Sequence, residues 1–451
     1  MPANSRSPAF AWPLAAAAMG LALLAPALWN GFPFIYPDTG GYLARPIEGT
    51  LELGRSALYG VFLVAGMTLD FWPVVVAQAA LTIWLIAVTL RAHGLGRRPW
   101  LALVAMLSVA TSMPWFAGQL IPDMFVAAAV LALHLLAYRA SALNRGERLA
   151  LAAVVAVAIA SHMGTLALCV ALAAAIWLAR LLPLHLPRPR LTLAGITIAA
   201  GIALAPLSNL AITGKFAFTP GGESFLFGRL VQDGIVARYL AQRCPDAKIK
   251  LCAYAATMPT TADDWLWAPD TPLNKLGGWR GYADEERRII RDTLLLYPGG
   301  HLITAIRATL DQLLSFKTDV SVNPGYNAPA LQQLGELTPG LMPRLLAARQ
   351  QARPFDLDAL NMLHVPFAAL ACAGLIAVAL FGRRLNVAPR TLALNFSLLT
   401  ALIFNAAICG VFSNPVDRYQ SRLIWLAPLA LAIAVLDRRG RGHLGLAPEF
   451  P

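Results

Sequence analysis

The feature that most constrains this chain is a series of apolar runs of roughly 17–25 residues, separated by short segments rich in arginine. A helical run of that length matches the thickness of the hydrocarbon core of a bilayer. The chain is 58% hydrophobic and only 13% charged, whereas a soluble protein typically carries about 25% charged residues. The sequence therefore predicts an all-α polytopic membrane protein whose apolar runs cross the membrane.

Basic residues gather in the short segments between the apolar runs. The clusters are Arg91/Arg97/Arg98, Arg139/Arg145/Arg148, Arg180/Arg188/Arg190, Arg383/Arg384/Arg390 and Arg438/Arg439/Arg441. Basic loops stay on the cytoplasmic side of a membrane, so the net charge of +12 needs no nucleic acid as a partner. We expect a multi-pass protein of the bacterial inner membrane with both termini in the cytoplasm.

Placing every basic cluster in the cytoplasm predicts about ten spans. They are expected at 9–30, 73–90, 99–116, 124–138, 149–161, 163–182, 191–212, 358–382, 391–412 and 421–437. Residues 57–69 are interpreted as a short helix on the outer surface, because a further span there would move the Arg91 cluster outside. His301–Phe316 is also apolar, but counting it as a span breaks the alternation, so an amphipathic surface helix is favoured.

This threading divides the chain into three parts. Residues 1–212 form a transmembrane module whose first outer loop is 31–56, residues 213–355 form a periplasmic segment, and residues 356–451 hold the last spans and a basic tail. Cys244 and Cys252 lie close together in the periplasmic segment, where an oxidising compartment favours a disulfide over two free thiols. No further cysteine or histidine nearby has the spacing of zinc ligands, so no metal site is predicted there.

The polar motifs outside the basic clusters fall on the outer face. They are YPDTGGYLARP (36–46), LGRSALYG (53–60), GQLIPDMF (118–125), SHMG (161–164), GGESFLFGRLVQDG (221–234) and SNPVDRYQSR (413–422). An ionisable residue at a span end is a functional candidate, because burying it without a partner is costly. Several such residues at one depth indicate a site on the outer face.

Asp38 allows two interpretations. Pro-Asp-x-Gly is a strong turn signal by itself, so the carboxylate can close an Asx turn. A turn does not explain the flanking Tyr36 and Tyr42, or the length of loop 31–56. The alternative is a positioned general base that takes a proton from an incoming hydroxyl group.

Asp123 and His162 also have a structural and a functional interpretation. Asp123 can be the first residue of a helix, where a carboxylate complements the helix dipole, or it can belong to the site. His162 can be a residue at a helix break whose ring bonds the backbone, or a site residue. The charged residues of loop 221–234, Glu223, Arg229 and Asp233, are weaker candidates.

Three arginines lie at the outer ends of spans, contrary to the preference for the cytoplasmic side. They are Arg55, Arg418 and Arg422. Arg418 can pair with the adjacent Asp417. A guanidinium fork fits a phosphate equally well.

The arrangement resembles the GT-C superfamily of integral membrane glycosyltransferases, which use polyprenyl-phosphate-linked sugars. The resemblance rests on an inward N-terminus, an acidic first outer loop (YPDTGGY) and a short surface helix before the second span. It implies a seven-helix module over the first seven spans, followed by about three more. It also implies that Asp38 is the first-loop catalytic acid, that Asp123 in IPDMF is the acidic residue of the second outer loop, and that Arg418 and Tyr419 face the lipid phosphate.

The resemblance implies transfer of a sugar from a polyprenyl-phosphate donor to a lipid or glycan hydroxyl on the periplasmic face. Arg55, Tyr42 and His162 would bind substrate, and Trp265 and Trp267 would stack against sugar rings. The first loop has one aspartate rather than an acidic pair, which puts metal dependence in question. The mechanism that we expect is inverting and metal-independent, with a divalent cation left open. We expect a monomer that contacts membrane lipids. The alternatives are a transporter or flippase for a lipid-linked glycan and a non-catalytic scaffold.

Overall fold

The computed structural model describes residues 11–51, 53–319 and 325–439 of the chain. The regular secondary structure of this part is helical, and its extended pairing is limited to one isolated parallel bridge between Phe34 and Gln119. Six helical segments in it are long and apolar enough to cross a membrane. They are α1 (Ala11–Asn30), α4 (Trp72–Ala92), α10 (Leu191–Thr213), α21 (Asp358–Phe381), α22 (Pro389–Phe412) and the consecutive helices α23 (Asp417–Ile424) and α24 (Leu426–Arg439). The chain is therefore a helical membrane protein, as the sequence predicts.

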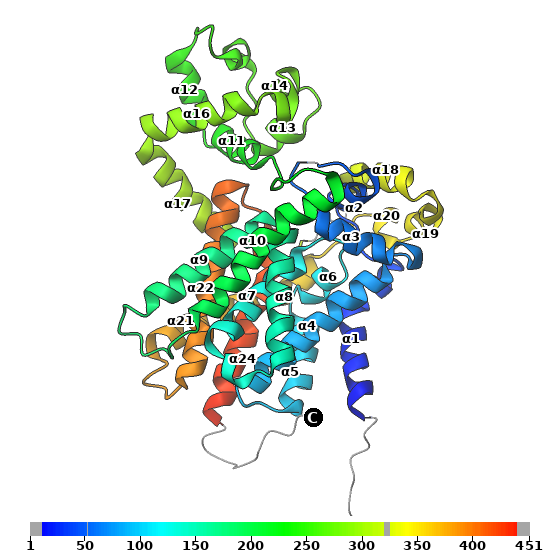
Figure 1. Ribbon diagram of the computed structural model, residues 1–451, viewed down its shortest axis with the longest axis vertical. Coiled ribbons are helices and arrows are strands. Elements are labelled where there is room, and N and C mark those ends of the chain that lie inside the picture. Colours follow the sequence, from blue (N-terminus) through cyan, green and yellow to red (C-terminus); the bar gives the residue numbers. More distant parts are fainter. Residues whose placement is uncertain (1–10, 52, 320–324, 440–451) are drawn as a thin grey trace, which may run out of the picture.

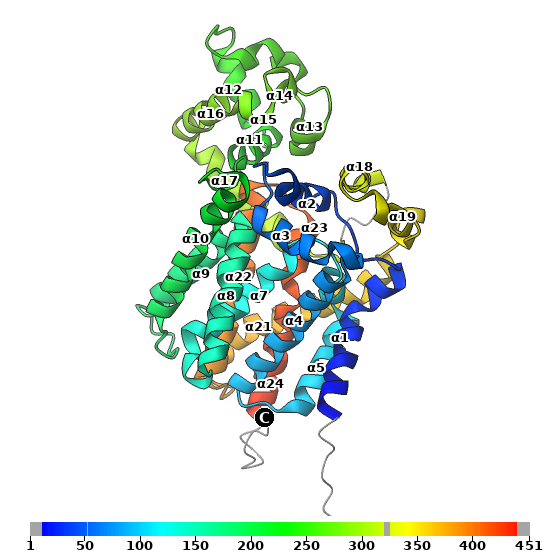
Figure 2. The same ribbon diagram turned by 45° about the vertical axis from the view of Figure 1, so that its right-hand side comes forward.

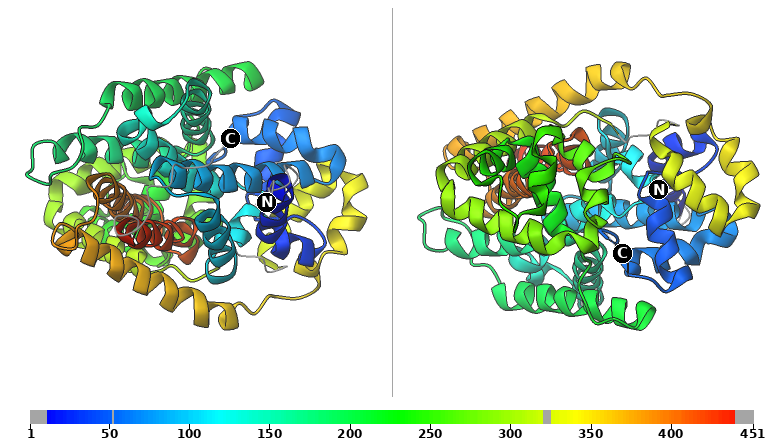
Figure 3. Two further views of the ribbon diagram at one scale, coloured as in Figure 1. Left: turned by 90° about the horizontal axis from the view of Figure 1, so that it is seen from below. Right: turned by 90° about the horizontal axis from the view of Figure 1, so that it is seen from above.

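Shorter helices complete the bundle, and they are α5 (Arg97–Ala110), α6 (Met113–Ala117), α7 (Asp123–Tyr138), α8 (Arg145–Ser161) and α9 (Met163–Ala179). Every residue of α7 is buried, which is expected of a helix that is apolar all round and surrounded by others. Figure 3 shows α21 along the outside of the bundle, whereas α23 and α24 lie within it.

Two backbone breaks shape the end of the bundle where the site lies. The run predicted as one helix at 99–116 is divided, because α5 ends at Ala110 and α6 starts at Met113 with Pro114, which has no amide hydrogen to donate. Between α3 (Ala57–Gly66) and α4, Asp70 and Phe71 both adopt positive φ angles, of 53° and 62°. Residues 57–69 are thus separate from the following span, as predicted.

The basic clusters lie at the end of the bundle opposite to the helices drawn in green at the top of Figure 1. Ion pairs and hydrogen bonds tie this basic end together: Arg91 pairs with Glu147, and Arg390 pairs with Asp437 at 2.7 Å. Arg441, the basic tail after it, and the first residues of the predicted span 9–30 lie outside the described residues.

The other end of the bundle bears a small helical head with its own apolar core. Its helices are α11 (Gly222–Gln232), α12 (Ile235–Arg243), α13 (Ala262–Trp267), α14 (Pro272–Lys275), α15 (Gly278–Gly281) and α16 (Ala283–Leu296). Cys244 and Cys252 form a disulfide here, with 5.5 Å between their Cα atoms.

A second group of helices lies beside the head rather than within it, as Figure 2 shows. It consists of α18 (Ala328–Leu337), α19 (Met342–Leu346) and α20 (Arg349–Ala352). Helix α18 packs on α2 (Thr39–Glu48) so closely that a Cβ atom on Gly40 would lie 2.5 Å from the side chain of Gln333. Gly40 therefore allows this close packing, and the segment 213–355 has two separate parts.

Helix α17 (Pro298–Leu314) connects the head to the bundle and crosses the outer end of α22. At the crossing, a Cβ atom on Gly410 would lie 2.5 Å from the carbonyl oxygen of Ala308. Away from α22 the helix exposes a stripe of large apolar side chains, namely Leu302, Ile303, Ile306, Leu310 and Leu314. Such a stripe suits a helix at a membrane surface, and the surface position expected for residues 301–316 stays a prediction.

We expect the exposed stripe of α17 to contact lipid. In nanodiscs, a cysteine at Leu310, which is 54% exposed, should react slowly with a water-soluble maleimide, because lipid acyl chains cover it. A cysteine at Asp284 of the head, whose side chain is 95% exposed, is the matched control and should react fast. Equal reaction rates at the two positions would contradict lipid contact by α17.

The buried Glu286 of the head makes its stability depend on pH. Burial raises the pKa of Glu286 from 4.5 to about 7, although Ser224 and Trp265 both donate hydrogen bonds to the carboxylate. The folded head therefore holds a proton that the unfolded chain releases, so stability is highest below the unfolded pKa and is lost as the pH rises through the folded one.

We expect the free energy of unfolding of the head to fall by about 3 kcal/mol between pH 4.5 and pH 7. Thermal unfolding followed by tryptophan emission measures this, because Trp265 contacts the carboxylate. Glu286→Gln should abolish that slope, whereas Asp284→Asn, on the exposed side of the same helix, should keep it. The same slope in wild type and Glu286→Gln would contradict this assignment.

Candidate active site

The structure brings Asp38, Arg55, Asp123 and Arg418 together at the head end of the bundle, although they come from four separate segments. Together with Arg422 they form a series of alternating charges, which we call the charged cluster. Along it, Arg55 contacts Asp38, Asp38 faces Arg418, and Arg418 and Arg422 both contact Asp123.

Asp38 immediately precedes α2, so the expected loop 31–56 contains a helix of ten residues. Its carboxylate makes no capping hydrogen bond to that helix. The hydroxyl of Thr39 stabilises the turn instead, accepting a hydrogen bond from the amide of Tyr36 at 2.9 Å and donating one to the carbonyl of Leu120 at 3.1 Å. Because the turn does not use the Asp38 side chain, its carboxylate is available to Arg55, to which it is hydrogen-bonded.

The loop that carries Arg55 is hydrogen-bonded to the head. Arg280 donates a hydrogen bond to the carbonyl of Leu51 at 2.7 Å, and the amide of Gly54 donates one to the carbonyl of Pro220 at 2.9 Å. Gly54 has φ +73°, a conformation that glycine adopts without strain. The head therefore sets the position of the arginine that binds Asp38.

Asp123 is the first residue of the central helix α7 and has no exposed surface. One carboxylate oxygen accepts from Arg418 Nε at 2.5 Å, and the other accepts from Arg418 Nη2 at 3.2 Å and from Arg422 Nη1 at 2.9 Å. A bidentate arginine and a second guanidinium compensate for the loss of hydration of this carboxylate. Asp123 is thus an ion-pair partner as well as a helix N-terminal residue.

Arg418 and Arg422 are one turn apart on α23, so both side chains point from the same face of that helix. The guanidinium of Arg418 stacks on the ring of Tyr36, with 3.9 Å between its carbon and the ring centroid. Arg422 also donates to Asn405 of α22 at 3.2 Å. Arg418 does not pair locally with Asp417, whose carboxylate accepts instead from the amide of Lys317 at 2.8 Å.

The charged cluster carries three guanidinium groups and two carboxylates, so its formal charge is 3 − 2 = +1. The contact between Asp38 and Arg418 is loose, at 3.7 Å, which exceeds a hydrogen bond. The side chains of Asp38 and Arg55 remain 24% and 18% exposed, whereas Asp123 is fully buried. A ligand with negative charge would therefore meet Asp38 and Arg55 first.

His162 separates α8 from α9 and is in electrostatic contact with Arg422 and Asp123. Its Nδ1 atom is buried and has no hydrogen-bond partner, so the backbone bond expected at a helix break is not made by that nitrogen. Tyr42 is buried in an edge-to-face contact with Tyr59, at 5.2 Å between centroids. Tyr419 is half-buried beside both arginines of α23.

The weaker candidates of loop 221–234 lie away from the charged cluster. Glu223 pairs with Arg287 on the head surface. Arg229 and Asp233 form a buried ion pair at 2.7 Å where the head meets the bundle, and Arg229 also donates to Asn414 at 3.3 Å. The expectation that Trp265 stacks on a sugar is wrong, because its ring is fully buried in the core of the head.

Sequence reasoning missed the part that Tyr36 and Asn405 take in the site. In the sequence Tyr36 stands out only as a neighbour of Asp38, yet its ring stacks on Arg418. Asn405 is a polar residue inside an apolar span, and its side chain bonds Arg422 and the carbonyl of Tyr419. An amide at span depth is itself a signal, because it needs a partner there.

The described residues contain no group of three or more histidine, cysteine, aspartate or glutamate side chains suited to a metal ion. In the charged cluster, guanidinium groups occupy the positions around both carboxylates. The cluster therefore fits an anion better than a cation.

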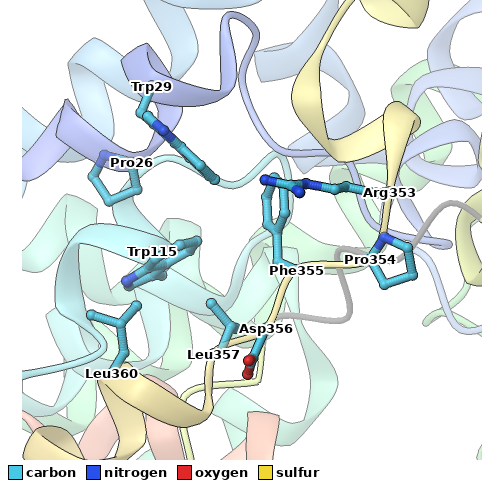
Figure 4. Close-up of a pocket in the computed structure, with 9 residues that line it drawn as sticks. All are labelled: Pro26, Trp29, Trp115, Arg353, Pro354, Phe355, Asp356, Leu357 and Leu360. Carbon is cyan, nitrogen blue, oxygen red and sulfur yellow. The ribbon is translucent and has the colours of Figure 1, made fainter.

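A pocket of about 500 Å³ lies beside the last turns of α1, where Pro26 and Trp29 line it. Figure 4 shows Trp29, Trp115 and Phe355 around it, with the guanidinium of Arg353 at its rim. Phe34 contacts the pocket wall, stacking on Trp115 at 5.5 Å and meeting Phe355 edge-on. Since Phe34 is two residues before Tyr36, one short segment borders both the pocket and the cluster.

Comparison with protein-family models, with curated proteins and with solved structures finds no match for this chain. Its function therefore has to be inferred from the charged cluster and the surfaces around it.

The structure predicts that Asp123 is needed for stability. Asp123→Ala leaves two buried guanidinium groups without their carboxylate, which should cost about 3–5 kcal/mol of unfolding free energy. Thermal unfolding of the purified protein in detergent measures the loss. Asp311→Ala removes an exposed carboxylate and serves as the control, with an expected change below about 0.5 kcal/mol. If the two variants melt together, the buried ion pairs do not stabilise the fold.

Proposed function

We propose that the protein is a membrane glycosyltransferase that moves a sugar from a polyprenyl-phosphate donor to a hydroxyl group of a lipid or glycan. The observation that carries this proposal is the placement of Asp38, a partly exposed carboxylate between two guanidinium groups at the head end of a membrane bundle. A carboxylate can accept a proton from an attacking hydroxyl. Guanidinium groups beside it can stabilise the negative charge of a departing phosphate.

The reaction is a single displacement at the anomeric carbon of the donor sugar. The acceptor oxygen forms the new bond to that carbon on the face opposite to the phosphate, and its proton passes to Asp38. The bond between the carbon and the phosphate oxygen breaks, and its electron pair stays on the phosphate, which Arg55 and Arg418 bind. The product sugar has inverted configuration, and the guanidinium groups supply the positive charge without a metal ion.

The two acidic residues have different roles in this proposal. Asp123 is fully buried under Arg418 and Arg422, so it holds these arginines in position and does not reach the substrate. Asp38 has about a quarter of its side chain exposed, so an acceptor can approach it. Asp38 is therefore the catalytic residue and Asp123 is a positioning residue.

The pocket beside α1 supports a donor carried on a lipid. Its lining is mainly aromatic and aliphatic, with the side chains of Arg353 and Asp356 as its charged groups. Such a lining suits an apolar chain attached to a phosphate group. A donor that is held by its lipid also needs no nucleotide-binding motif, and none of the P-loop type is present in the sequence.

We further propose a threading of about ten spans, in which the shorter apolar helices also cross the membrane. Residues 1–212 then form a GT-C-like module, residues 213–355 face the periplasm and residues 356–451 return to the cytoplasm. The basic end of the bundle supports this orientation in a bacterial inner membrane. A transporter or flippase would hold its polar site at mid-membrane, whereas the charged cluster lies at the head end.

The proposal predicts that Asp38→Asn abolishes sugar transfer. Asparagine keeps the shape of the side chain but cannot take up the proton, so the rate should fall by about 10²–10⁴-fold. The assay incubates purified protein with a panel of radiolabelled polyprenyl-phosphate sugars and a membrane-lipid extract as the acceptor source. Asp70→Asn alters another partly exposed ion-paired aspartate outside the cluster and should transfer at the wild-type rate. Equal transfer by wild type and Asp38→Asn would remove Asp38 from the mechanism.

A further inference from the structure

The head presents three aromatic rings beside the charged cluster. Phe225 of α11, Trp267 of α13 and Trp279 of α15 are mutually packed, with centroids 5.2–6.1 Å apart. The guanidinium carbon of Arg55 lies 5.7 Å from the centre of the Trp267 ring. We call these three residues the aromatic platform. It adjoins the charged cluster through Arg55, which also binds Asp38.

The platform is the outer of two aromatic layers built from the same segments. Two residues from Phe225 and Trp267 along the chain, Phe227 and Trp265 pack against each other at 5.0 Å inside the core of the head. The Nε1 atom of Trp265 donates to the buried carboxylate of Glu286. The inner layer fixes the backbone of both segments, so the outer rings are held in place by residues that a ligand does not touch.

Phe225 and Trp279 pack against the core of the head, whereas the exposure of Trp267 is not explained by the fold itself. Trp267 is 51% exposed although the inner layer already provides a core for the head. The ring is not placed in the lipid-facing bundle, where exposed aromatic residues are expected, but against an arginine of the site. Large exposed aromatic surface next to polar groups marks a binding site.

We infer that the aromatic platform is a carbohydrate-binding subsite that holds a sugar ring of the acceptor above Arg55 and Asp38. The inference rests on the proposed function and adds that the acceptor is a glycan or glycolipid. The C–H face of a pyranose ring is apolar and stacks on an aromatic ring, while its hydroxyl groups require polar partners at the edges. The platform supplies the rings, and Arg55 and Asp38 supply polar groups at one edge.

The position of the platform favours the acceptor over the donor sugar. The platform belongs to the head, which lies at one end of the helical bundle. The pocket proposed for the donor lipid is built instead on helices of the bundle, with Trp29 on α1 and Trp115 on α6. A sugar on the platform lies next to Arg55, which pairs with the Asp38 carboxylate that takes the proton of the acceptor hydroxyl.

Binding is tested first, without any transfer reaction. The wild-type protein in nanodiscs is applied to an array of defined oligosaccharides, and we expect it to retain at least one of them. Trp267→Ala should lower the affinity for that glycan by about tenfold or more, because the stacking contact is lost. Trp267→Phe, which keeps an aromatic face, should recover most of it. Trp177→Ala removes a similarly exposed tryptophan of α9 and should bind as wild type does.

The kinetic test separates this inference from the proposed function. With the retained glycan as acceptor, Trp267→Ala should raise the acceptor KM by about tenfold and leave the donor KM and kcat nearly unchanged. Asp38→Asn should bind the glycan normally but fail to transfer sugar to it. If Asp38→Asn transfers normally, the proposed function fails while binding by the platform can still be measured.

Three results would overturn the inference. Wild type could retain no glycan on the array, or Trp267→Ala could bind and react as wild type does. Trp267→Ala could also raise only the donor KM, which would assign the platform to the donor sugar. Equal thermal unfolding of the wild-type and Trp267→Ala proteins ensures that a loss of binding is not a loss of folding, and Trp267→Phe provides the second check.

Discussion

The head end of the molecule depends on the buried ion pairs that Asp123 makes with Arg418 and Arg422. These partners are 295 and 299 residues apart in the sequence, and they join the start of the central helix to the last membrane segment. A carboxylate without solvent exposure is stable only when such partners surround it. By fastening α23 to α7, the pairs also place the guanidinium of Arg418 opposite Asp38.

Burial separates two aspartates that look alike in the sequence. Both follow a proline at the outer end of the bundle, in YPDTGGY and IPDMF. Asp123 is enclosed by guanidinium groups, whereas Asp38 keeps part of its surface because Thr39, and not Asp38, satisfies the turn before α2. In the first loop, the carboxylate of Asp38 therefore stays accessible to a ligand between Arg55 and Arg418. In the second loop, Asp123 binds Arg418 and holds it in position. A fold of this kind can combine stability and reactivity without placing both on one residue.

The sequence predicts much of the bundle because span length and basic flanks are local properties. The apolar runs at 73–90, 191–212, 358–382 and 391–412 correspond to long apolar helices. Interactions between distant segments were not predictable in the same way. The helix in loop 31–56 is stabilised by packing against α18, and Trp265 is buried by the core of the head while Trp267 is not. Trp265 and Trp267 are only two residues apart on α13, yet one is buried and the other is exposed. The sequence does not show which face of this short helix packs against the core of the head.

The sequence by itself determined that the chain is a helical membrane protein and which of its charges gather at one end of the bundle. Hydrophobic length and the distribution of arginine fix these properties, since both act on each segment separately. Only the tertiary structure decided how those charges pair, and that Asp123 is fully buried while Asp38 is partly exposed. It also decided that Arg55 of the first loop lies over the ring of Trp267 in the head. The physical reason is that the pairing and burial of a charge depend on groups brought from remote parts of the chain, and their positions follow from the packing of the whole bundle.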